Sequence, residues 1–367
     1  MANRYWVGGG SSANWNATAP TNWGTASNTQ DNASVPTSTD DVIFDGVGTG
    51  ASNSTISAAI TINSLDCTGY ANTLTHNNVL TLTIAGNLFK LSSGMTYVAA
   101  VNTCLILFTS TSGTTLITTA GKGIRTITFD GVGGTFQLQD ALAGSSATAS
   151  VLTLTNGTFD TNNFNVTWAR FASNNSNIRT LTMGSSTFSL GGTNVTPWNL
   201  ATTTNLTFNV GTSVITFTDI LGFSKTFAGG GLQYATVTLG VDFIVISGNN
   251  TFNTLNVNMA NLATGLQITS GSTQTIVNSF TTNGDSGIIV KLSATTPGSA
   301  FTLSKVSGIV CEDWMSIQDS TASGGAVWSA GANSTNVSGN SGWAFTACPG
   351  SVCIPTFAEI PTVPTLK

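Results

Sequence analysis

The stretches RTITFDG (125–131) and VLTLTNG (151–157) alternate apolar residues with threonine or asparagine, and both end at a glycine. Alternation with a period of two is the pattern of a β-strand with one buried face, and the glycine marks a turn. Similar runs occur elsewhere in the chain: TLTIAG (81–86), NLTFNVG (205–211), ATVTLG (235–240), TLNVNM (254–259) and FTLSKVSG (301–308). No segment of useful length shows the apolar periodicity of an amphipathic helix. The sequence therefore predicts an all-β protein.

The predicted strands repeat along the chain. FDGVG stands at 44–48 and again at 129–133, and Thr-Phe pairs occur at 135–136, 158–159, 187–188, 207–208, 226–227 and 251–252. Irregular repetition every 20 to 30 residues or so is typical of a solenoid, in which each coil buries its apolar face against its neighbours. We expect a parallel β-helix or related β-solenoid body, with Thr, Ser and Asn ladders along its axis. A β-sandwich of antiparallel modules is the alternative, because such loose spacing does not exclude it.

The composition sets limits on the partners. The chain has 367 residues, 40% of them hydrophobic and only 7% charged, with 19 phenylalanines. Disordered chains have few aromatic residues and many charges, so this chain is expected to fold. The net charge is −5 and the Lys and Arg residues are scattered singly, whereas nucleic-acid binding needs clustered cations. No apolar run reaches the length of about 18 residues that spans a membrane, and MANRYWVGGG (1–10) lacks the features of a secretory signal peptide.

Tryptophans gather near the two ends of the sequence. Six of the eight lie there: Trp6, Trp15, Trp23, Trp314, Trp328 and Trp343. A solenoid has two open ends whose exposed core and unpaired edges must be covered. We therefore expect a Trp-rich cap or attachment segment at 1–50, a solenoid body at 51–308 and a Trp-rich cap at 309–346. The less favoured alternative is that exposed indole rings stack on sugars, and the carbohydrate-binding residues are then Trp6, Trp15, Trp23, Trp328 and Trp343.

The last stretch, ACPGSVCIPTFAEIPTVPTLK (347–367), is rich in proline, which prevents helix and favours extended structure. It predicts an extended tail rather than another coil. A free extended segment can add itself to the sheet edge of a neighbour. We expect an assembly tail that makes its contacts through Pro355, Phe357, Pro361 and Pro364, with a loosely ordered terminus as the alternative.

Few residues of the chain suit catalysis or redox chemistry. His76 is the single histidine of the sequence and lies in the polar segment THNNV (75–79), where we expect a surface residue. The five cysteines are odd in number and widely spaced, which argues against a disulfide framework. We expect Cys348 and Cys353 of CPGSVC to be structurally incidental thiols, with a hairpin disulfide between them as the alternative.

Carboxylates are the remaining candidates for chemistry. Glycoside hydrolysis needs two carboxylates that face one sugar. The candidates are Asp40 with Asp41, Glu312 with Asp313, and the isolated Asp140, Asp160, Asp219 and Asp242. Neighbours on a strand point to opposite faces, so a hydrolase or lyase site requires carboxylates from different coils. A Ca²⁺ ion is the one cofactor with candidate ligands, Asp40, Asp41 and Asp45, since carboxylate oxygens bind it.

Two segments resemble a known family. The first comprises RYWVGGGSSANWNATAPTNWGTAS (4–27) and ASVPTSTDDVIFDG (33–46), and the second is VCEDWMSIQDSTASGGAVWSAGANSTNVSGNSGWAFT (310–346). They resemble the opening and terminal segments of structural proteins from tailed-bacteriophage virions. The likeness covers about 80 residues, while the body is similar only in style.

The resemblance implies a non-enzymatic virion component: a β-helical fibre, a spike, or a decoration of the head or tail. It implies synthesis in the host cytoplasm and location on the virion. The implied partners are other virion proteins, further copies of the chain (with a trimer favoured) and a host-surface glycan. The alternatives from other functional classes are a tailspike-type polysaccharide hydrolase or lyase, and a carbohydrate-binding adhesin module.

Overall fold

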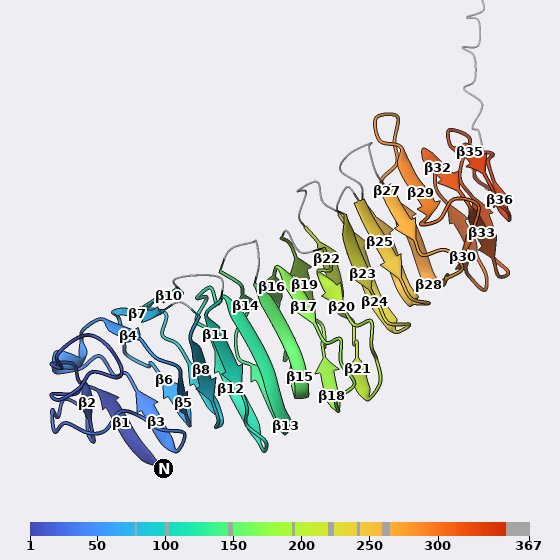
Figure 1. Ribbon diagram of the computed structural model, residues 1–367. Coiled ribbons are helices and arrows are strands. Elements are labelled where there is room, and N and C mark those ends of the chain that lie inside the picture. The colour runs from blue at the N-terminus through green and yellow to red at the C-terminus, as the bar shows by residue number, and fades with distance from the viewer. Residues whose placement is uncertain are drawn as a thin grey trace, which may run out of the picture.

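The computed structural model describes residues 1–349 apart from 78, 100–102, 146–149, 193–194, 219–223, 241–242 and 259–264. The chain is 51% strand and about 1% helix, and it forms a parallel β-solenoid of about 12 turns. Its coils stack along one axis, and the N terminus and the last strands lie at opposite ends of the rod (Figure 1). The predicted solenoid is confirmed, and the antiparallel sandwich is not formed.

Each turn of the solenoid has three sides. The strands β17 (Arg170–Ala172), β18 (Arg179–Thr182) and β19 (Thr187–Leu190) are followed by β20, β21 and β22. Each of the first three pairs in parallel with the third strand after it. A parallel pair needs a crossover connection, and here the other two sides of the coil provide it.

Among the described residues, the largest sheet has 21 strands. Its long strands β13 and β15 each pair with two successive strands of the neighbouring coil, so they join two sides of the rod. Besides β17 and β18 the sheet comprises β1 (Ala2–Trp6), β2 (Trp23–Gly24), β3 (Asp40–Ile43), β5 (Ile60–Ile62), β6 (Ser64–Asp66), β8 (Thr81–Ile84), β9 (Leu88–Lys90), β11 (Leu105–Phe108), β12 (Thr114–Thr118), β13 (Thr126–Leu138), β15 (Val151–Asp160), β20 (Trp198–Asn199), β21 (Leu206–Asn209), β23 (Lys225–Ala228), β25 (Phe243–Ser247), β27 (Gly265–Ile268), β29 (Val290–Ala294), β32 (Met315–Gln318) and β35 (Thr335–Ser338).

Three smaller sheets complete the described part of the rod. Nine strands form one of them: β14 (Leu142–Ala143), β16 (Val166–Trp168), β19, β22 (Val214–Phe217), β24 (Gln233–Leu239), β26 (Thr251–Val257), β28 (Thr273–Thr282), β30 (Phe301–Ser304) and β33 (Ser320–Ser323). Near the two ends lie β4 (Ser54–Ile56), β7 (Thr73–His76) and β10 (Thr96–Ala99), and β31 (Ile309–Cys311), β34 (Val327–Ser329) and β36 (Trp343–Ala344). A single 3-10 turn, η1 (Gly48–Gly50), is the helical element of these residues.

Alternate side chains of each strand point into the coil. In the first half of β13, Ile127 and Phe129 are buried, while Thr126 and Thr128 are half-buried on the outer face. Burying the apolar half of each strand removes it from water and supplies the main driving force for folding. The period-two pattern read in RTITFDG is therefore the inward and outward alternation of this strand.

The core is continuous along the axis. Buried side chains form one hydrophobic cluster from Trp6 near one end to Ala330 near the other. Within it, aromatic rings follow one another with centroids 4.6–6.5 Å apart: Phe89, Phe108, Phe129, Phe159, Phe171, Trp198, Phe227 and Phe252. Pairs at such separations stabilise a core beyond their buried area, so this column ties successive coils together.

Tryptophans close both ends of the core. Near the N terminus four rings pack with centroids 5.3–6.0 Å apart: Trp6, Trp15, Trp23 and Phe44. Near the other end, Trp328 packs edge-on against Trp343 with centroids 5.1 Å apart. Four of the six end tryptophans are therefore buried as expected of caps (Trp6, Trp15, Trp23 and Trp328), whereas Trp314 and Trp343 are half-buried. The segment 309–346 also contains regular coils, because β32 and β34 pair in parallel with strands before and after them.

Truncating a ring of the column tests the core. We expect Phe129→Ala to lower the free energy of unfolding by about 3–5 kcal/mol, because it removes a fully buried ring and leaves a cavity. Val132 lies on the same strand with 63% of its surface exposed, so Val132→Ala is the matched control and should change stability by no more than about 0.5 kcal/mol. Denaturant unfolding of both variants checks this, and equal effects would contradict the described alternation.

Candidate functional site

The tryptophans proposed for sugar binding are mostly buried. Trp6, Trp15, Trp23 and Trp328 are at most 3% exposed. Trp343 is half-buried, and its indole N–H donates to the hydroxyl of a neighbouring serine. Sugars stack on an exposed ring face, so the first four rings cannot bind one. This corrects the sugar-binding alternative for these four residues, which lie in the core.

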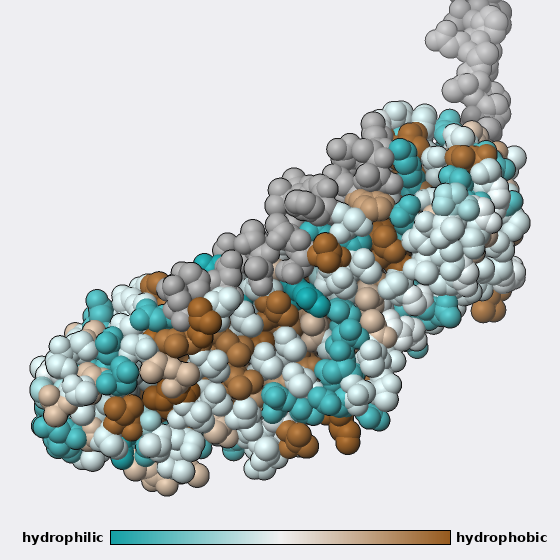
Figure 2. All heavy atoms as spheres, viewed as in Figure 1, coloured by the Kyte–Doolittle hydropathy of each residue, from teal (hydrophilic) through white to brown (hydrophobic). Residues whose placement is uncertain are grey.

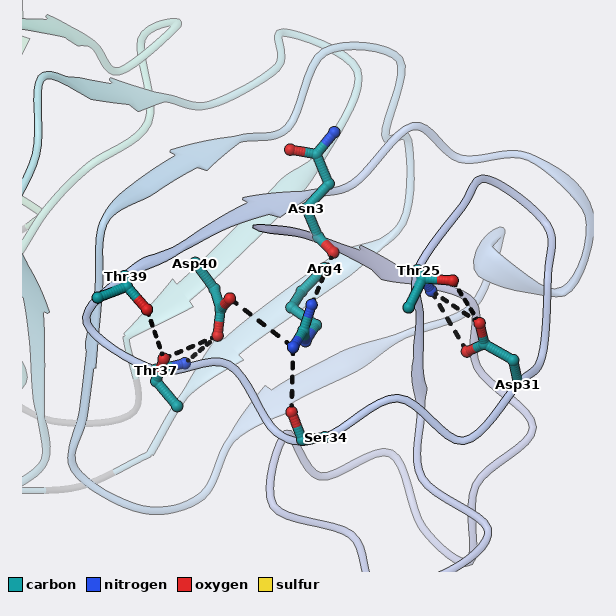
Figure 3. A network of polar contacts seen from close by, with 8 residues as sticks. All are labelled: Asn3, Arg4, Thr25, Asp31, Ser34, Thr37, Thr39 and Asp40. Carbon is teal, nitrogen blue, oxygen red and sulfur yellow. Dashed lines mark hydrogen bonds and ion pairs between the residues drawn. The ribbon is translucent and has the colours of Figure 1, made fainter. Parts of the chain in front are cut away.

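The carboxylates proposed for Ca²⁺ do not converge. Asp40 is buried, lies 3.8 Å from the guanidinium of Arg4 and accepts hydrogen bonds from the N–H and hydroxyl of Thr37 at 2.9 and 2.8 Å (Figure 3). Asp41 is on the opposite face of the same strand, and Asp45 accepts from the backbone two residues later. No group of three or more His, Cys, Asp or Glu side chains in the described ranges could hold a metal ion. The Ca²⁺ site at Asp40, Asp41 and Asp45 is therefore not supported.

His76 is not a surface residue, contrary to expectation. Its ring is fully buried at the end of β7. Nε2 lies 3.0 Å from the carbonyl of Leu80 and must donate to it, so Nδ1 accepts from the hydroxyl of Tyr97 at 2.8 Å. Both nitrogens are thus satisfied in the neutral form. Burial lowers the pKa of His76 to about 4, although the hydrogen bond to Leu80 opposes the shift.

The burial of His76 makes stability depend on pH. Because the pKa is lower in the folded chain than the usual 6.5, the contribution is fully present above about pH 6.5 and is lost as pH falls towards 4. We expect the loss to approach about 3 kcal/mol. His76→Phe keeps a ring but cannot titrate. The stability difference between the two proteins should therefore change between pH 7 and pH 4.5 in thermal or denaturant unfolding, and a constant difference would contradict this account.

Cys348 pairs with a distant cysteine. It forms a disulfide with Cys311, which is 37 positions away in the sequence, with the two Cα atoms 5.7 Å apart. Cys348 is therefore not the incidental thiol that the sequence predicts, and the alternative, a disulfide with Cys353, is also wrong. The large separation in sequence gave no indication of this pairing, because it is the stacking of coils that brings the two cysteines together. Several predicted residues lie outside the described part of the chain: Asp219, Asp242, Cys353, Pro355, Phe357, Pro361 and Pro364.

Other candidate carboxylates hold turns together. The carboxylate of Glu312 accepts from the N–H and the hydroxyl of Thr282 at 2.7 and 2.9 Å, and burial raises its pKa. Asp313 accepts from the backbone N–H of Asn333, and its neighbour Glu312 is not part of the same contact. Asp140 accepts from two successive backbone N–H groups of the preceding coil. These contacts give each carboxylate a structural role.

A groove of about 570 Å³ lies on the outer surface near the N-terminal end. It crosses the strands β1, β3, β6 and β9 and the turn before β12. Figure 1 shows β1, β3 and β6 beside one another there, and Figure 2 shows apolar side chains among hydrophilic ones over this half of the rod. The lining mixes carboxylates, amides, hydroxyls and apolar groups, and it includes Asn3, Asp41, Ile43, Asn63, Asp66, Asn87, Leu88 and Ser112.

Hydrogen bonds fix the two carboxylates of the groove. Oδ1 of Asp41 accepts from the amide of Asn63 at 2.6 Å and from the hydroxyl of Ser64 at 2.5 Å. Oδ1 of Asp66 accepts from the N–H and the hydroxyl of Thr68 at 2.8 and 2.6 Å. Each carboxylate has an Oδ2 without a hydrogen-bond partner among the described residues. These oxygens are held in place and remain able to accept.

Sequence reasoning missed most of this groove. It named Asp41 as a metal ligand and, with Asp40, as a candidate catalytic carboxylate, and it did not single out Asn63, Asp66 or Asn87. Asp41 and Asn63 are 22 residues apart and in contact, because stacking places them on neighbouring coils. A repeat of polar residues at about one coil length was the available signal, and the loose repeat of this chain obscured it.

No family model, no curated protein and no solved structure matches the chain. In the part that the structure describes, no helix is long and apolar enough to cross a membrane. The function is therefore inferred from the chain's own residues and their geometry.

Proposed function

We propose that the chain is a non-enzymatic structural component of a tailed-bacteriophage virion: a fibre, a spike, or a decoration of the head or tail. The observation that carries this proposal is the single core that runs from Trp6 to Ala330 and is closed by tryptophans at both ends. A closed rod supports itself and offers long flanks for contact with other molecules. Such a shape suits a part that projects from a particle or covers it.

The two segments that resemble virion proteins support the proposal by their positions. Residues 4–46 contain β1, β2 and β3 at one end of the rod, and residues 310–346 contain the last coils at the other. In this proposal they are the ends that meet other virion proteins, and the protein is located on the virion after synthesis in the host cytoplasm.

Labelling of purified particles tests this function. We expect gold-conjugated antibodies against the chain to decorate phage particles that encode it, and peptides of the chain to appear in gradient-purified particles. An early, non-virion phage protein serves as the negative control. Abundant chain in the infected lysate together with its absence from purified particles would contradict the proposal.

A polysaccharide hydrolase or lyase is the second candidate, and the groove favours it. Asp41 pairs with Ser64 and Ile43 pairs with Asp66. The two aspartates are thus one strand spacing and two residues apart, about 8 Å between Cα atoms. Inverting glycosidases likewise use two carboxyl groups that are far enough apart to leave room for a water molecule. Release of reducing ends from host capsule or lipopolysaccharide by the purified chain would favour this candidate over the structural one.

We further propose that the chain assembles as a homotrimer. One flank supports side-by-side packing because its two columns of outward side chains lack charge: Thr187, Ser189, Val214, Thr216, Thr236, Thr238, Thr254, Asn256, Ser279 and Thr281. Low charge weakens the repulsion between copies, and closed symmetric assemblies are the usual outcome.

Light scattering tests the assembly. The intact chain should have the mass of a trimer, and deletion of residues 349–367 should weaken the assembly more than it lowers the melting temperature, if the tail contacts a neighbouring copy. A monomeric intact chain that is unaffected by the deletion would contradict both the trimer and the assembly role of the tail.

A further inference from the structure

The groove across β1, β3, β6 and β9 has the features of a binding site for an extended ligand. It crosses neighbouring strands at a spacing of about 4.8 Å, so its path from β1 to the turn before β12 covers about 19 Å along the axis. Its polar groups recur from coil to coil along this path. A surface whose polar groups repeat is better suited to an oligomer with repeating units than to a single small molecule.

The hydrogen-bonding groups of the groove suit a ligand that carries hydroxyls. The free Oδ2 atoms of Asp41 and Asp66 are acceptors. Asn87 accepts from Ser110 through Oδ1 at 2.9 Å, and its amide nitrogen, which has no hydrogen-bond partner in the described part of the chain, is a donor. A sugar hydroxyl both donates and accepts, so neighbouring hydroxyls can satisfy both kinds of group.

The groove also has an apolar part. Ile43 and Leu88 are half-buried side chains of its lining. Ligand sites combine apolar walls with a few placed polar groups, and the C–H face of a sugar ring can lie on such a wall. Because hydrogen bonds already hold Asp41 and Asp66, little ordering is needed when a ligand binds.

Charge selects among sugars. Two carboxylates line the groove. Two cationic groups lie beside them, the terminal ammonium of Met1 in the lining and Lys90 in register with Asp66, but in the described part of the chain neither forms an ion pair with Asp41 or Asp66. The carboxylates therefore remain available to a protonated amine, which would complement their charge. We propose that this groove binds an amine-bearing oligosaccharide of the glucosamine type, laid along the solenoid axis. The inference rests on the proposed function for its setting, a host-surface glycan, but concerns the groove alone.

The test compares two ligands that differ only in charge. The purified full-length chain is titrated calorimetrically with glucosamine oligomers and with fully N-acetylated oligomers of equal length, at a pH where the amines are protonated. We expect tighter binding of the free amine form, and weaker binding as salt screens the charges. Dextran and polygalacturonate serve as neutral and acidic probes. Equal binding of the amine and acetylated forms, preference for polygalacturonate, or no binding of any probe would overturn the proposal.

A matched pair of variants locates the site. Asp41→Asn with Asp66→Asn keeps the shape of both side chains and should raise the Kd for glucosamine oligomers about tenfold or more. Asp160→Asn is the control, because Asp160 belongs to the same side of the rod outside the groove. An equal effect of the control would overturn the assignment. If the double variant does not fold, the salt dependence of glucosamine-oligomer binding to the unaltered chain decides the question.

The outcomes keep this inference separate from the proposed function. Failure to bind any probe leaves the labelling of particles unaffected. Absence from particles together with selective binding of glucosamine oligomers would contradict the virion role while supporting the groove. Release of reducing ends from a bound oligomer would contradict the non-enzymatic role and support the groove as the sugar site.

Discussion

The structure depends on the pairing of each coil with the next. A single three-sided coil has an apolar interior but no neighbour to cover its upper and lower edges. Folding of one coil alone would therefore bury little apolar surface and give little stability. Parallel pairing satisfies the backbone of both coils and brings their inward side chains into contact. The register Phe108 to Phe129 shows this, because the pairing of strands sets one ring beside the next. Pairing also creates the difficulty that the fold must solve, since the first and last coils each lack a neighbour on one side.

The aromatic caps solve that difficulty by covering the core near the ends of the rod. Trp6, Trp15 and Trp23 fill the N-terminal end with buried rings whose N–H groups are all hydrogen-bonded. The ends of the rod therefore offer little core for further coils to extend. Ligand binding along the rod then depends on the outer side chains. Coil stacking places residues from similar positions of successive coils side by side on the outer surface, as it does for Asp41 and Asn63. A groove can therefore form without a local sequence motif.

The strands could be predicted from the sequence because alternation is local. In RTITFDG each apolar residue was correctly expected to face inward. Four of the six end tryptophans are buried as expected of caps, and Trp314 and Trp343 are half-buried. The errors concern contacts between coils. His76 has polar neighbours in sequence but is covered by Tyr97 from the next coil. Cys348 finds its partner 37 residues away, and Asp66 joins the groove only through the register of β3 with β6. A loose repeat does not give that register, so neither the groove nor the disulfide could be derived.

The central claim is that the caps keep the rod a closed unit. The most direct test is light scattering of the chain without residues 1–39, which include Trp6, Trp15 and Trp23, beside the intact chain over a range of concentrations. The account predicts that the intact chain keeps one fixed assembly size. The shortened chain, with Phe44 and the edge of β3 uncovered, should associate end to end into species that grow with concentration. A shortened chain that keeps the size and melting temperature of the intact one would contradict the claim.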